Sequence, residues 1–354
     1  MSPVLPFPED DLNNLLTDNK EYLAELAQGT VLLTGGTGFI GKWFLSLFAE
    51  WNRTSDEKIN VWIPSRNPRK FLTDYPHLET KEFLYFEGDI RSMTLPEGSI
   101  ATVIHAATDV GDPQKAADYT TIFDVCVNGT NHLLKAIKGR GVKRFLLLSS
   151  GAVYGKQDPD VEKLREDSPS TLDVTKAQSA YGEGKRVSEW LVAQAGRENS
   201  YKVSIARVFA LIGPGIPLTG PFAAGNFINN AINNLAIAIK GNGKVTRSYL
   251  YISDLISWLF KLTAIDESVG IYNVGSDIPY TILDLAEIIS NEFLNHRPVV
   301  IENKTSDNQP NSIYIPSIDK IKNIGAVQKV DILSATRKTY FWYLKQRGKN
   351  AGAM

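Results

Sequence analysis

The sequence predicts an α/β protein in which a doubly wound parallel sheet carries helices on both faces. Strand-like apolar runs alternate with helical patterns along most of the chain, and this alternation is typical of right-handed crossovers between parallel strands. At 354 residues the chain exceeds a typical single domain, so we expect one large core with a smaller lobe or two closely joined domains. A glycine cluster after the first predicted strand gives the sheet an edge suited to a ligand.

The predicted sheet begins after an N-terminal helix. Residues Asp10 to Leu26 form an amphipathic pattern, which would pack over the sheet edge or against a second copy of the chain. Strands are then predicted from Thr30 and over Ile59–Pro64, Glu82–Phe86, Ala101–His105, Arg144–Ser149 and Lys202–Phe209. Helical stretches separate them, as parallel strands require.

From Gly213 onward the pattern changes to a loop rich in proline and glycine, followed by a predicted helix over Asn226–Lys240. A further helix starts at Ser253, and a strand over Gly270–Val274 would rejoin the main sheet. We therefore divide the chain into an N-terminal helical extension (1–28), a main domain (29–212, rejoined by about 250–275) and a smaller interleaved C-terminal lobe (213–249 and 276–345).

Composition and charge narrow the possible partners. The chain has 38 Lys and Arg against 39 Asp and Glu, a formal net charge of -1, which offers no basic field for nucleic acid or an anionic membrane. Cys126 is the only cysteine, so no intrachain disulfide forms and a reducing compartment is expected. The segment Met1 to Asp11 lacks the pattern of a signal peptide, and no membrane span is evident. We expect a cytoplasmic protein and predict no metal site.

The stretch Thr30 to Gly41 organises the rest of the chain. Its apolar run ends in glycines and passes straight into the helical pattern Phe39–Glu50. Free N–H groups and the positive end of the helix dipole then converge on one point, which suits a phosphate. Gly36-x-Gly38-x-x-Gly41 fits the dinucleotide fingerprint of Rossmann-type folds, although an ordinary glycine turn would read the same in isolation. The predicted dinucleotide contacts here are Gly35, Gly38, Phe39, Ile40 and Gly41.

A second constellation follows the fifth predicted strand. Tyr181 and Lys185 are four residues apart on a predicted helix and therefore share a face. An ammonium close to a phenol stabilises the phenolate and makes the pair useful for proton transfer near neutrality. Ser150, at the end of the neighbouring strand, would polarise a carbonyl beside them. Tyr-x-x-x-Lys alone is more often a chance helical pair, but after a glycine-fingerprint strand it predicts a catalytic centre.

These motifs and several others stand in an order that resembles the extended short-chain dehydrogenases/reductases, and within them the nucleotide-sugar epimerases, dehydratases and reductases. The resemblance covers about residues 30–330. Besides the glycine turn and the Tyr-x-x-x-Lys pair, its motifs are Gly88-Asp89-Ile90-Arg91, Val103-Ile104-His105-Ala106-Ala107, Asn128-Gly129-Thr130, Ser149-Ser150-x-x-Val153-Tyr154-Gly155, Ala206-Arg207-Val208-Phe209, Gly241-x-Gly243-x-x-x-Arg247-Ser248-Tyr249 and Tyr272-Asn273-Val274-Gly275. Each motif alone is modest evidence for the family, but their order and spacing together are strong evidence.

The resemblance implies roles at the catalytic centre. Tyr181 would be the general acid/base, and Lys185 would contact the nicotinamide ribose and tune Tyr181. Ser150 would hold the reacting oxygen, and Asn128 would complete a catalytic tetrad.

The resemblance also implies binding roles. Asp89 and Ile90 would bracket the adenine, and Ala106 and Ala107 would line the dinucleotide groove. Arg247 would bind the diphosphate of a nucleotide sugar, for which a planar and permanently charged guanidinium is suited. Read alone, Arg247 would pass for an ordinary surface arginine.

Departures from the family pattern narrow the reaction. In the sugar 4,6-dehydratases an acidic pair separates the catalytic hydroxyl from the Val-Tyr-Gly of the fifth-strand motif, and here those positions are Gly151 and Ala152. Neither side chain moves a proton, so dehydration and glutamate-assisted decarboxylation are disfavoured. The same small residues would leave room beside Ser150 for either orientation of a sugar ring. Ala210 stands where many relatives have an asparagine that touches the diphosphate.

The choice of cofactor depends on the end of the second strand, where an acid would accept hydrogen bonds from the ribose hydroxyls of NAD. This chain has Ser65-Arg66 followed by Arg69, and no acid. Arg66 would instead neutralise a 2′-phosphate, unless it belongs to a solvated basic turn. The residues therefore favour NADP, with NAD as the alternative.

The favoured function is NADPH-dependent reduction of a 4-keto-6-deoxy nucleotide sugar by a homodimer. A nucleotide-sugar 4-epimerase with retained NAD is nearly indistinguishable, because both reactions use the same hydride and proton path. A reductase of lipophilic ketones is disfavoured by the charge of Arg247. It is also disfavoured by the polar helix that starts at Asn226, a predicted substrate contact. A non-catalytic dinucleotide-binding regulator is disfavoured because Ser150, Tyr181 and Lys185 are all present.

Overall fold

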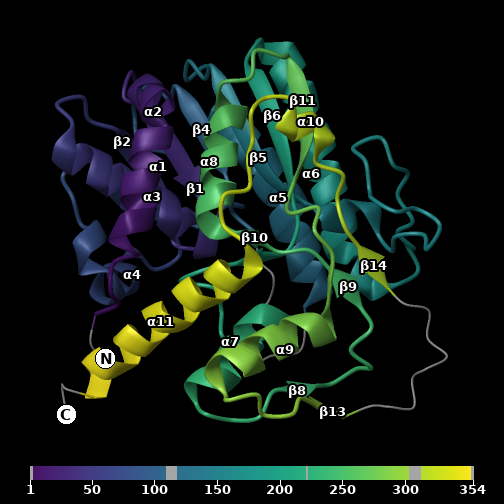
Figure 1. Cartoon of the computed structure of the whole chain (residues 1–354). Coiled ribbons are helices and arrows are strands. Elements are labelled where there is room, and N and C mark those ends of the chain that lie inside the picture. Colours follow the sequence, from purple (N-terminus) through teal and green to yellow (C-terminus); the bar gives the residue numbers. More distant parts are fainter. Residues whose placement is uncertain (1–2, 109–117, 221, 303–311, 352–354) are drawn as a thin grey trace.

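The centre of the computed structural model is a seven-stranded sheet whose neighbouring strands are all parallel (Figure 1). The structure describes residues 3–108, 118–220, 222–302 and 312–351. The strand order is β11-β6-β5-β4-β1-β2-β3, with β1 (Thr30–Thr34), β2 (Asn60–Ser65), β3 (Phe83–Glu87), β4 (Thr102–His105), β5 (Arg144–Ser150), β6 (Lys202–Val208) and β11 (Val269–Val274). The order reverses between β1 and β4, which confirms the predicted doubly wound, Rossmann-type sheet.

Helices cover both faces of this sheet (Figure 1). On one face α1 (Glu9–Asp18), α3 (Phe39–Thr54) and α8 (Ile252–Thr263) pack against one another. On the other face α5 (Tyr119–Ala136) packs against α6 (Ala180–Asn199). Because both faces are covered, the central strands do not alternate between apolar and polar residues. All four residues of β4 are buried, as are the last four of β1.

A smaller group of elements lies below the sheet in the view of Figure 1. It comprises α7 (Ala223–Ile232), α9 (Ile282–Phe293) and the two-residue strands β7 (Leu211–Ile212), β8 (Ala238–Ile239), β9 (Thr246–Arg247), β10 (Leu250–Tyr251), β12 (Tyr280–Thr281), β13 (Val300–Ile301) and β14 (Ile313–Tyr314). Strand β9 pairs with both β12 and β14. The long helix α11 (Ile332–Ala351) runs between this group and the sheet. The shorter helices are α2 (Lys20–Leu26), α4 (Pro68–Asp74), α10 (Asp319–Lys322), η1 (Pro76–Leu78), η2 (Gly151–Tyr154) and η3 (Ala177–Ser179).

Two predicted helices have other bounds in the structure. The helix expected over Asp10–Leu26 is interrupted at Asn19, whose Nδ2 donates to the carbonyl of Leu15 at 2.8 Å and separates α1 from α2. The helix expected over Asn226–Lys240 ends with α7, because Asn234 has a φ of 54° and the chain then enters β8. Asparagine tolerates the left-handed conformation better than most residues, and apolar periodicity does not reveal such a stop.

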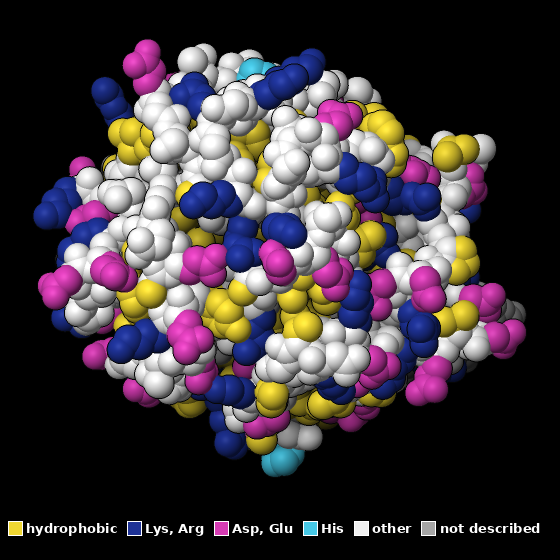
Figure 2. All heavy atoms as spheres, turned by 90° about the horizontal axis from the view of Figure 1, so that it is seen from above, with side chains coloured by type: hydrophobic (Ala, Val, Ile, Leu, Met, Phe, Trp, Pro, Cys, Tyr) yellow, Lys and Arg dark blue, Asp and Glu magenta, His cyan; other side chains and the backbone are white. Residues whose placement is uncertain are grey.

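The outer surface carries both signs of charge. Basic and acidic side chains are interspersed over the face seen in Figure 2. Among the helices of the described residues, none has the length and apolar character needed to cross a bilayer. In the same ranges, no three His, Cys, Asp or Glu side chains converge as the ligands of a metal ion would.

Candidate active site

A cavity of about 600 Å³ opens at the carboxyl ends of β1, β2, β4 and β5. It lies where the strand order reverses, which is the position at which open α/β sheets bind ligands. The structure brings most of the predicted site residues to its wall, namely Gly35, Gly38, Phe39, Ile40, Gly41, Arg66, Asp89, Ile90, Ala106, Ala107, Ser150, Tyr181 and Lys185.

The glycine turn between β1 and α3 leaves no space for side chains. Gly35 has a φ of 71°, and a Cβ there would lie 2.6 Å from backbone atoms of Ala106 and Ala107. A Cβ on Gly41 would lie 2.2 Å from the carbonyl oxygen of Gly35. The first turn of α3 therefore starts directly against the strand ends, with N–H groups that have no partner within the helix. This cradle fits the pyrophosphate of a dinucleotide.

The end of the cavity near β2 and β3 carries charged side chains. Asp89 accepts hydrogen bonds at 2.8 Å from Nε and Nη2 of Arg91. These bonds are the main reason why the pKa of Asp89 is lowered to about 2, and the charge of Arg66 adds to the effect. Asp89 is therefore ionised at neutral pH and can accept hydrogen bonds from a ligand at this end. Ile90, the next residue, packs its side chain against the Cα of Gly129, which has no side chain of its own.

A buried histidine joins the strand ends beneath the cavity. His105 Nδ1 lies 2.7 Å from Thr34 Oγ1, and its Nε2 lies 3.1 Å from Thr130 Oγ1. The Thr130 hydroxyl donates to the carbonyl of Cys126 at 2.6 Å, so Nε2 carries the ring proton and Nδ1 accepts from Thr34. Burial, followed by the charge of Lys185, lowers the pKa of His105 to about 3. The imidazole is therefore neutral and has one assigned tautomer.

Ser150, Tyr181 and Lys185 meet at the end of the cavity near β5. Lys185 is 2% exposed, and its Nζ donates to the carbonyl of Leu148 at 2.9 Å. This bond fixes the ammonium between β5 and α6. Ser150 Oγ accepts from the Ala152 N–H at 3.1 Å. The predicted trio is thus held on two adjacent elements, and the four-residue spacing on α6 places both of its members on the cavity side.

Tyr314 on β14 adjoins Ser150 at this end without lining the cavity, and no sequence motif identified it. Burial raises the pKa of its phenol well above the usual value, and a hydrogen bond with the Ser150 hydroxyl opposes that shift. The ring centroid of Tyr314 lies 4.7 Å from that of Phe209 and 5.3 Å from the guanidinium carbon of Arg247. Arg247 does not line the cavity itself, but its contact with Tyr314 places it near the β5 end of the cavity.

The space expected beside Ser150 is filled. A Cβ on Gly151 would lie 2.2 Å from the hydroxyl oxygen of Tyr314 and 2.8 Å from a ring carbon of Phe209. The expectation that Gly151 and Ala152 leave room for either orientation of a sugar ring is therefore wrong at Gly151. The glycine is required there by side chains that arrive from distant parts of the chain.

Residues 31–275 match the family model described as the NAD dependent epimerase/dehydratase family. The chain belongs to this family. The matched range runs from β1 to the residue after β11 and contains the glycine turn, Ser150, Tyr181 and Lys185. This confirms the family inferred from the motifs and makes the chain an enzyme of an NAD-dependent family. It does not support the preference for NADP drawn from Arg66.

Relatives of this epimerase/dehydratase chain include UDP-glucuronic acid decarboxylase 5 of Arabidopsis thaliana, which is 28% identical over 298 residues, 83% of each protein. The UDP-glucose 4-epimerase of Thermotoga maritima, solved with UDP-glucose, has a TM-score of 0.74 at 18% identity and covers 90% of this chain and 99% of its own. The UDP-glucuronic acid 4-epimerase of Bacillus cereus, solved with NAD, has a TM-score of 0.72 at 21% identity with the same coverage. The solved structures establish the shared fold.

Besides Arg247, two predicted residues of this family member do not line the cavity. The Asn128 Nδ2 donates at 2.6 Å to Asp124, one turn earlier on α5, and the side chain is exposed. The Asn226 Nδ2 donates at 2.9 Å to the carbonyl of Gly220. Neither residue lines the cavity, so the structure supports neither the tetrad role of Asn128 nor the substrate contact of Asn226. Both amides serve local structure instead.

In this epimerase/dehydratase chain, a buried ion pair between Glu189 and Arg207 contacts the end of β5. Glu189 accepts a hydrogen bond from Ser149 Oγ at 2.6 Å and pairs with Arg207 Nη2 at 2.8 Å. Burial alone would lower the pKa of Arg207, but the hydrogen bond and charge of Glu189 outweigh it and raise that pKa. Sequence reasoning missed Glu189. It stands four residues after Lys185 on α6, so the same helical spacing would have revealed it.

Proposed function

We propose that this enzyme is a nucleotide-sugar 4-epimerase that keeps its NAD bound. The observation that supports this proposal is the set of proton-transferring groups at the β5 end of the cavity. The hydroxyls of Ser150 and Tyr181 line that end, and the hydroxyl of Tyr314, outside the lining, hydrogen-bonds with Ser150. Among the described lining residues, Asp89 is the only carboxylate, and it lies toward β2 and β3. Dehydration and decarboxylation call for a further acid or base at the reacting carbons, whereas oxidation and reduction of a carbinol do not.

In the proposed reaction Tyr181 removes the proton of the sugar hydroxyl on carbon 4. Ser150 donates a hydrogen bond to the same oxygen, and the nearby ammonium of Lys185 stabilises the negative charge that develops. When bound, NAD supplies the hydride acceptor and donor. The site must then let the keto sugar present its other face before Tyr181 returns the proton.

Arg247 is the proposed anchor for the nucleotide diphosphate. Burial lowers the pKa of its guanidinium, with Tyr249 and Tyr314 acting in the opposite sense, and an arginine stays cationic at neutral pH. A guanidinium binds a diphosphate through parallel hydrogen bonds. We accordingly propose that 213–249 and 276–345 form the substrate lobe, that 29–212 with 250–275 binds the dinucleotide, and that 1–28 is an extension.

A second candidate is the NADPH-dependent reduction of a 4-keto-6-deoxy nucleotide sugar. One observation favours it: the end of β2 presents Ser65 and Arg66 to the cavity and no acid. Arg66 would then pair with a 2′-phosphate. The two candidates make opposite demands on the cofactor, since a reductase exchanges it at every turnover and an epimerase retains it.

The deciding experiment incubates the purified enzyme with UDP-glucose, UDP-glucuronic acid and UDP-N-acetylglucosamine without added cofactor. We expect conversion of one of them to its 4-epimer, and release of NAD from the protein after denaturation. Stoichiometric loss of NADPH absorbance with a 4-keto-6-deoxy nucleotide sugar would establish the reductase instead. Carbon dioxide released from UDP-glucuronic acid would identify a decarboxylase and contradict both candidates.

The homodimer and the cytoplasmic location stay predictions. Phe123 on α5 and Trp190 on the neighbouring α6 are 39% and 61% exposed. Large exposed apolar side chains on adjacent helices favour a protein interface. Sedimentation of wild type and Trp190→Glu would test whether this pair of helices forms it.

A further inference from the structure

The loop from Gly213 to Pro217 reaches the cavity through Pro217. Pro217 and the nearby Phe222 line it, together with Gly38 and Phe39 at the start of α3. In many enzymes a loop at the rim of a ligand cavity gates ligand exchange by opening and closing. What holds this loop in place therefore bears on how long a dinucleotide remains bound.

Side chains from outside the loop hold three consecutive residues of it, Pro214, Gly215 and Ile216. The indole Nε1 of Trp43, on α3, donates to the carbonyl of Pro214 at 2.9 Å. The hydroxyl of Tyr343, on α11, donates to the carbonyl of Ile216. Gly215 has a φ of 88° and lies against the ring of Phe7, where a Cβ would be 3.0 Å from a ring carbon.

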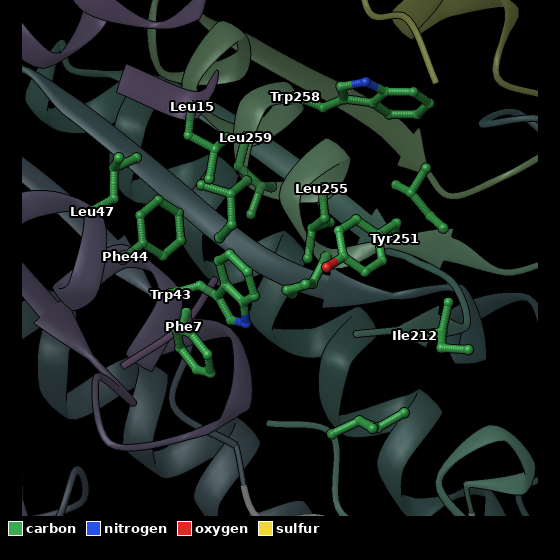
Figure 3. Close-up of a cluster of buried hydrophobic side chains, with 14 of the residues drawn as sticks. Phe7, Leu15, Trp43, Phe44, Leu47, Ile212, Tyr251, Leu255, Trp258 and Leu259 are labelled. Carbon is green, nitrogen blue, oxygen red and sulfur yellow. The ribbon is translucent and has the colours of Figure 1, made fainter. Parts of the chain in front are cut away.

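Phe7 belongs to the segment Val4–Pro8, which we call the N-terminal strap. Its ring stacks on that of Trp43, with centroids 4.3 Å apart and planes 7° apart. Figure 3 shows the two side chains next to each other. The ring of Trp342 on α11 lies 5.6 Å away on a tilt. The Trp342 Nε1 also donates to the carbonyl of Pro6 at 2.9 Å. Phe7 is therefore enclosed by two indoles and the loop, and it is only 5% exposed.

Hydrogen bonds from two backbone N–H groups fix the part of the strap that precedes Phe7. The Leu5 N–H donates to Gln346 Oε1 of α11 at 2.7 Å, and the Val4 N–H donates to the carbonyl of Asp74 at the end of α4 at 2.7 Å. Figure 1 shows the start of the chain beside the far end of α11. Two segments from opposite ends of the sequence thus meet on the outer side of a loop whose inner side faces the cavity.

We propose that the N-terminal strap and the Trp342–Tyr343 pair of α11 are positioning elements that hold loop 213–217 closed over the dinucleotide and so slow its release. Phe7 acts through Gly215 and Trp43, and Tyr343 acts through Ile216; neither is proposed to touch the cofactor. This inference rests on the proposed binding of NAD in the cavity. It adds a reason why the cofactor would be retained between turnovers, which the proposed 4-epimerase requires.

The test compares Phe7→Ala and Tyr343→Phe with wild type. Tyr343→Phe removes only the hydroxyl that reaches Ile216. The matched control is Phe293→Ala, because Phe293 of α9 also stacks on α11, with its ring 4.0 Å from that of Tyr340, away from the loop. Two quantities are measured: the rate at which radiolabelled NAD leaves the loaded enzyme, and amide hydrogen exchange at Gly213, Gly215 and Ile216, the loop residues with an amide hydrogen, in the enzyme without cofactor.

We expect Phe7→Ala to release NAD about ten to a hundred times faster, and Tyr343→Phe to release it a few times faster, with faster exchange in the loop for both. Phe293→Ala should lower the melting temperature without moving either quantity. Release that follows melting temperature across all three variants, or loop exchange equal to wild type, would overturn the inference. Faster loop exchange in an enzyme that epimerises no nucleotide sugar would uphold the positioning role and contradict the proposed function.

Discussion

The two ends of the cavity are built in different ways. At the end near β1, β2 and β3, the proposed dinucleotide end, each group lies in or directly after a main-sheet strand or at the start of the helix that follows, as in the turn from Thr34 to Gly41 or at Asp89. At the end near β5, the proposed sugar end, Ser150 of β5 meets Tyr314 of β14 and, behind it, Arg247 of β9. The first end follows from local rules of strand, turn and helix, whereas the second depends on pairing between strands of only two residues.

The largest expected effect is a loss of catalysis at the sugar end, with binding at the dinucleotide end unchanged. Tyr181→Phe should lower kcat by about two to four powers of ten, because the proposed general acid/base is lost. The affinity for NAD, measured by calorimetry, should stay near that of wild type. Turnover close to wild type would remove Tyr181 from its proposed role.

The next largest effect is a loss of dinucleotide binding caused by a collision with the backbone. Gly35→Ala should weaken NAD binding about a hundredfold or more, because its Cβ would collide with the backbone of Ala106 and Ala107 at 2.6 Å. Gly139→Ala is the matched control, since Gly139 has a φ of 75° but nothing within 4 Å of its Cβ position.

Gly139→Ala should cost only the strain of a left-handed residue, about 1 kcal/mol of unfolding free energy, and leave NAD affinity unchanged. Chemical denaturation and calorimetry on both variants separate the two effects. Equal losses of NAD affinity would show that strain rather than crowding matters at Gly35.

A smaller effect tests whether distant residues really meet at the sugar end. Gly151→Ala should lower kcat/KM about tenfold or more, because its Cβ would meet the Tyr314 hydroxyl at 2.2 Å. Tyr314→Phe should lower it about tenfold by removing a hydrogen-bond partner of Ser150. The double variant should lose less than the sum, since Tyr314→Phe relieves part of the collision. Additive losses would mean that the two residues do not touch in solution.

The smallest effect concerns Arg66. If NAD is the cofactor, Arg66→Ala should leave the Kd of NAD within about twofold while weakening NADP about tenfold. Fluorescence titration with both cofactors measures this directly. A wild type that binds NADP more tightly than NAD would contradict the assignment of NAD and revive the reductase.

The contrast between the two ends also explains what the sequence could predict. The glycine turn, Asp89 and the Tyr181–Lys185 pair each follow from spacing within one strand–turn–helix unit, and the structure brings all of them to one cavity. Tyr314 was out of reach because its neighbours Ser150 and Gly151 lie on a different element far away in the sequence, and a tyrosine in a short strand has no periodic signal.

The tetrad role of Asn128 stays a prediction, and the hydrogen bond that its side chain makes does not support it. Its motif marks the right helix, but the side chain bonds to Asp124 on the same helix rather than to the cavity. Helical spacing can place a residue on a helix face, while the choice of hydrogen-bond partner depends on the tertiary surroundings.

The neutral His105 has a consequence for acid resistance. Its pKa in the folded protein is about 3, below the value of about 6.5 expected in the unfolded chain. Between these values the unfolded chain binds one more proton at this ring than the native enzyme does. His105 therefore contributes to the free energy of unfolding fully above pH 6.5, and this contribution falls by about 1.4 kcal/mol for each pH unit toward pH 3. Above pH 7 the ring no longer titrates, so a change in turnover there has to originate in other groups.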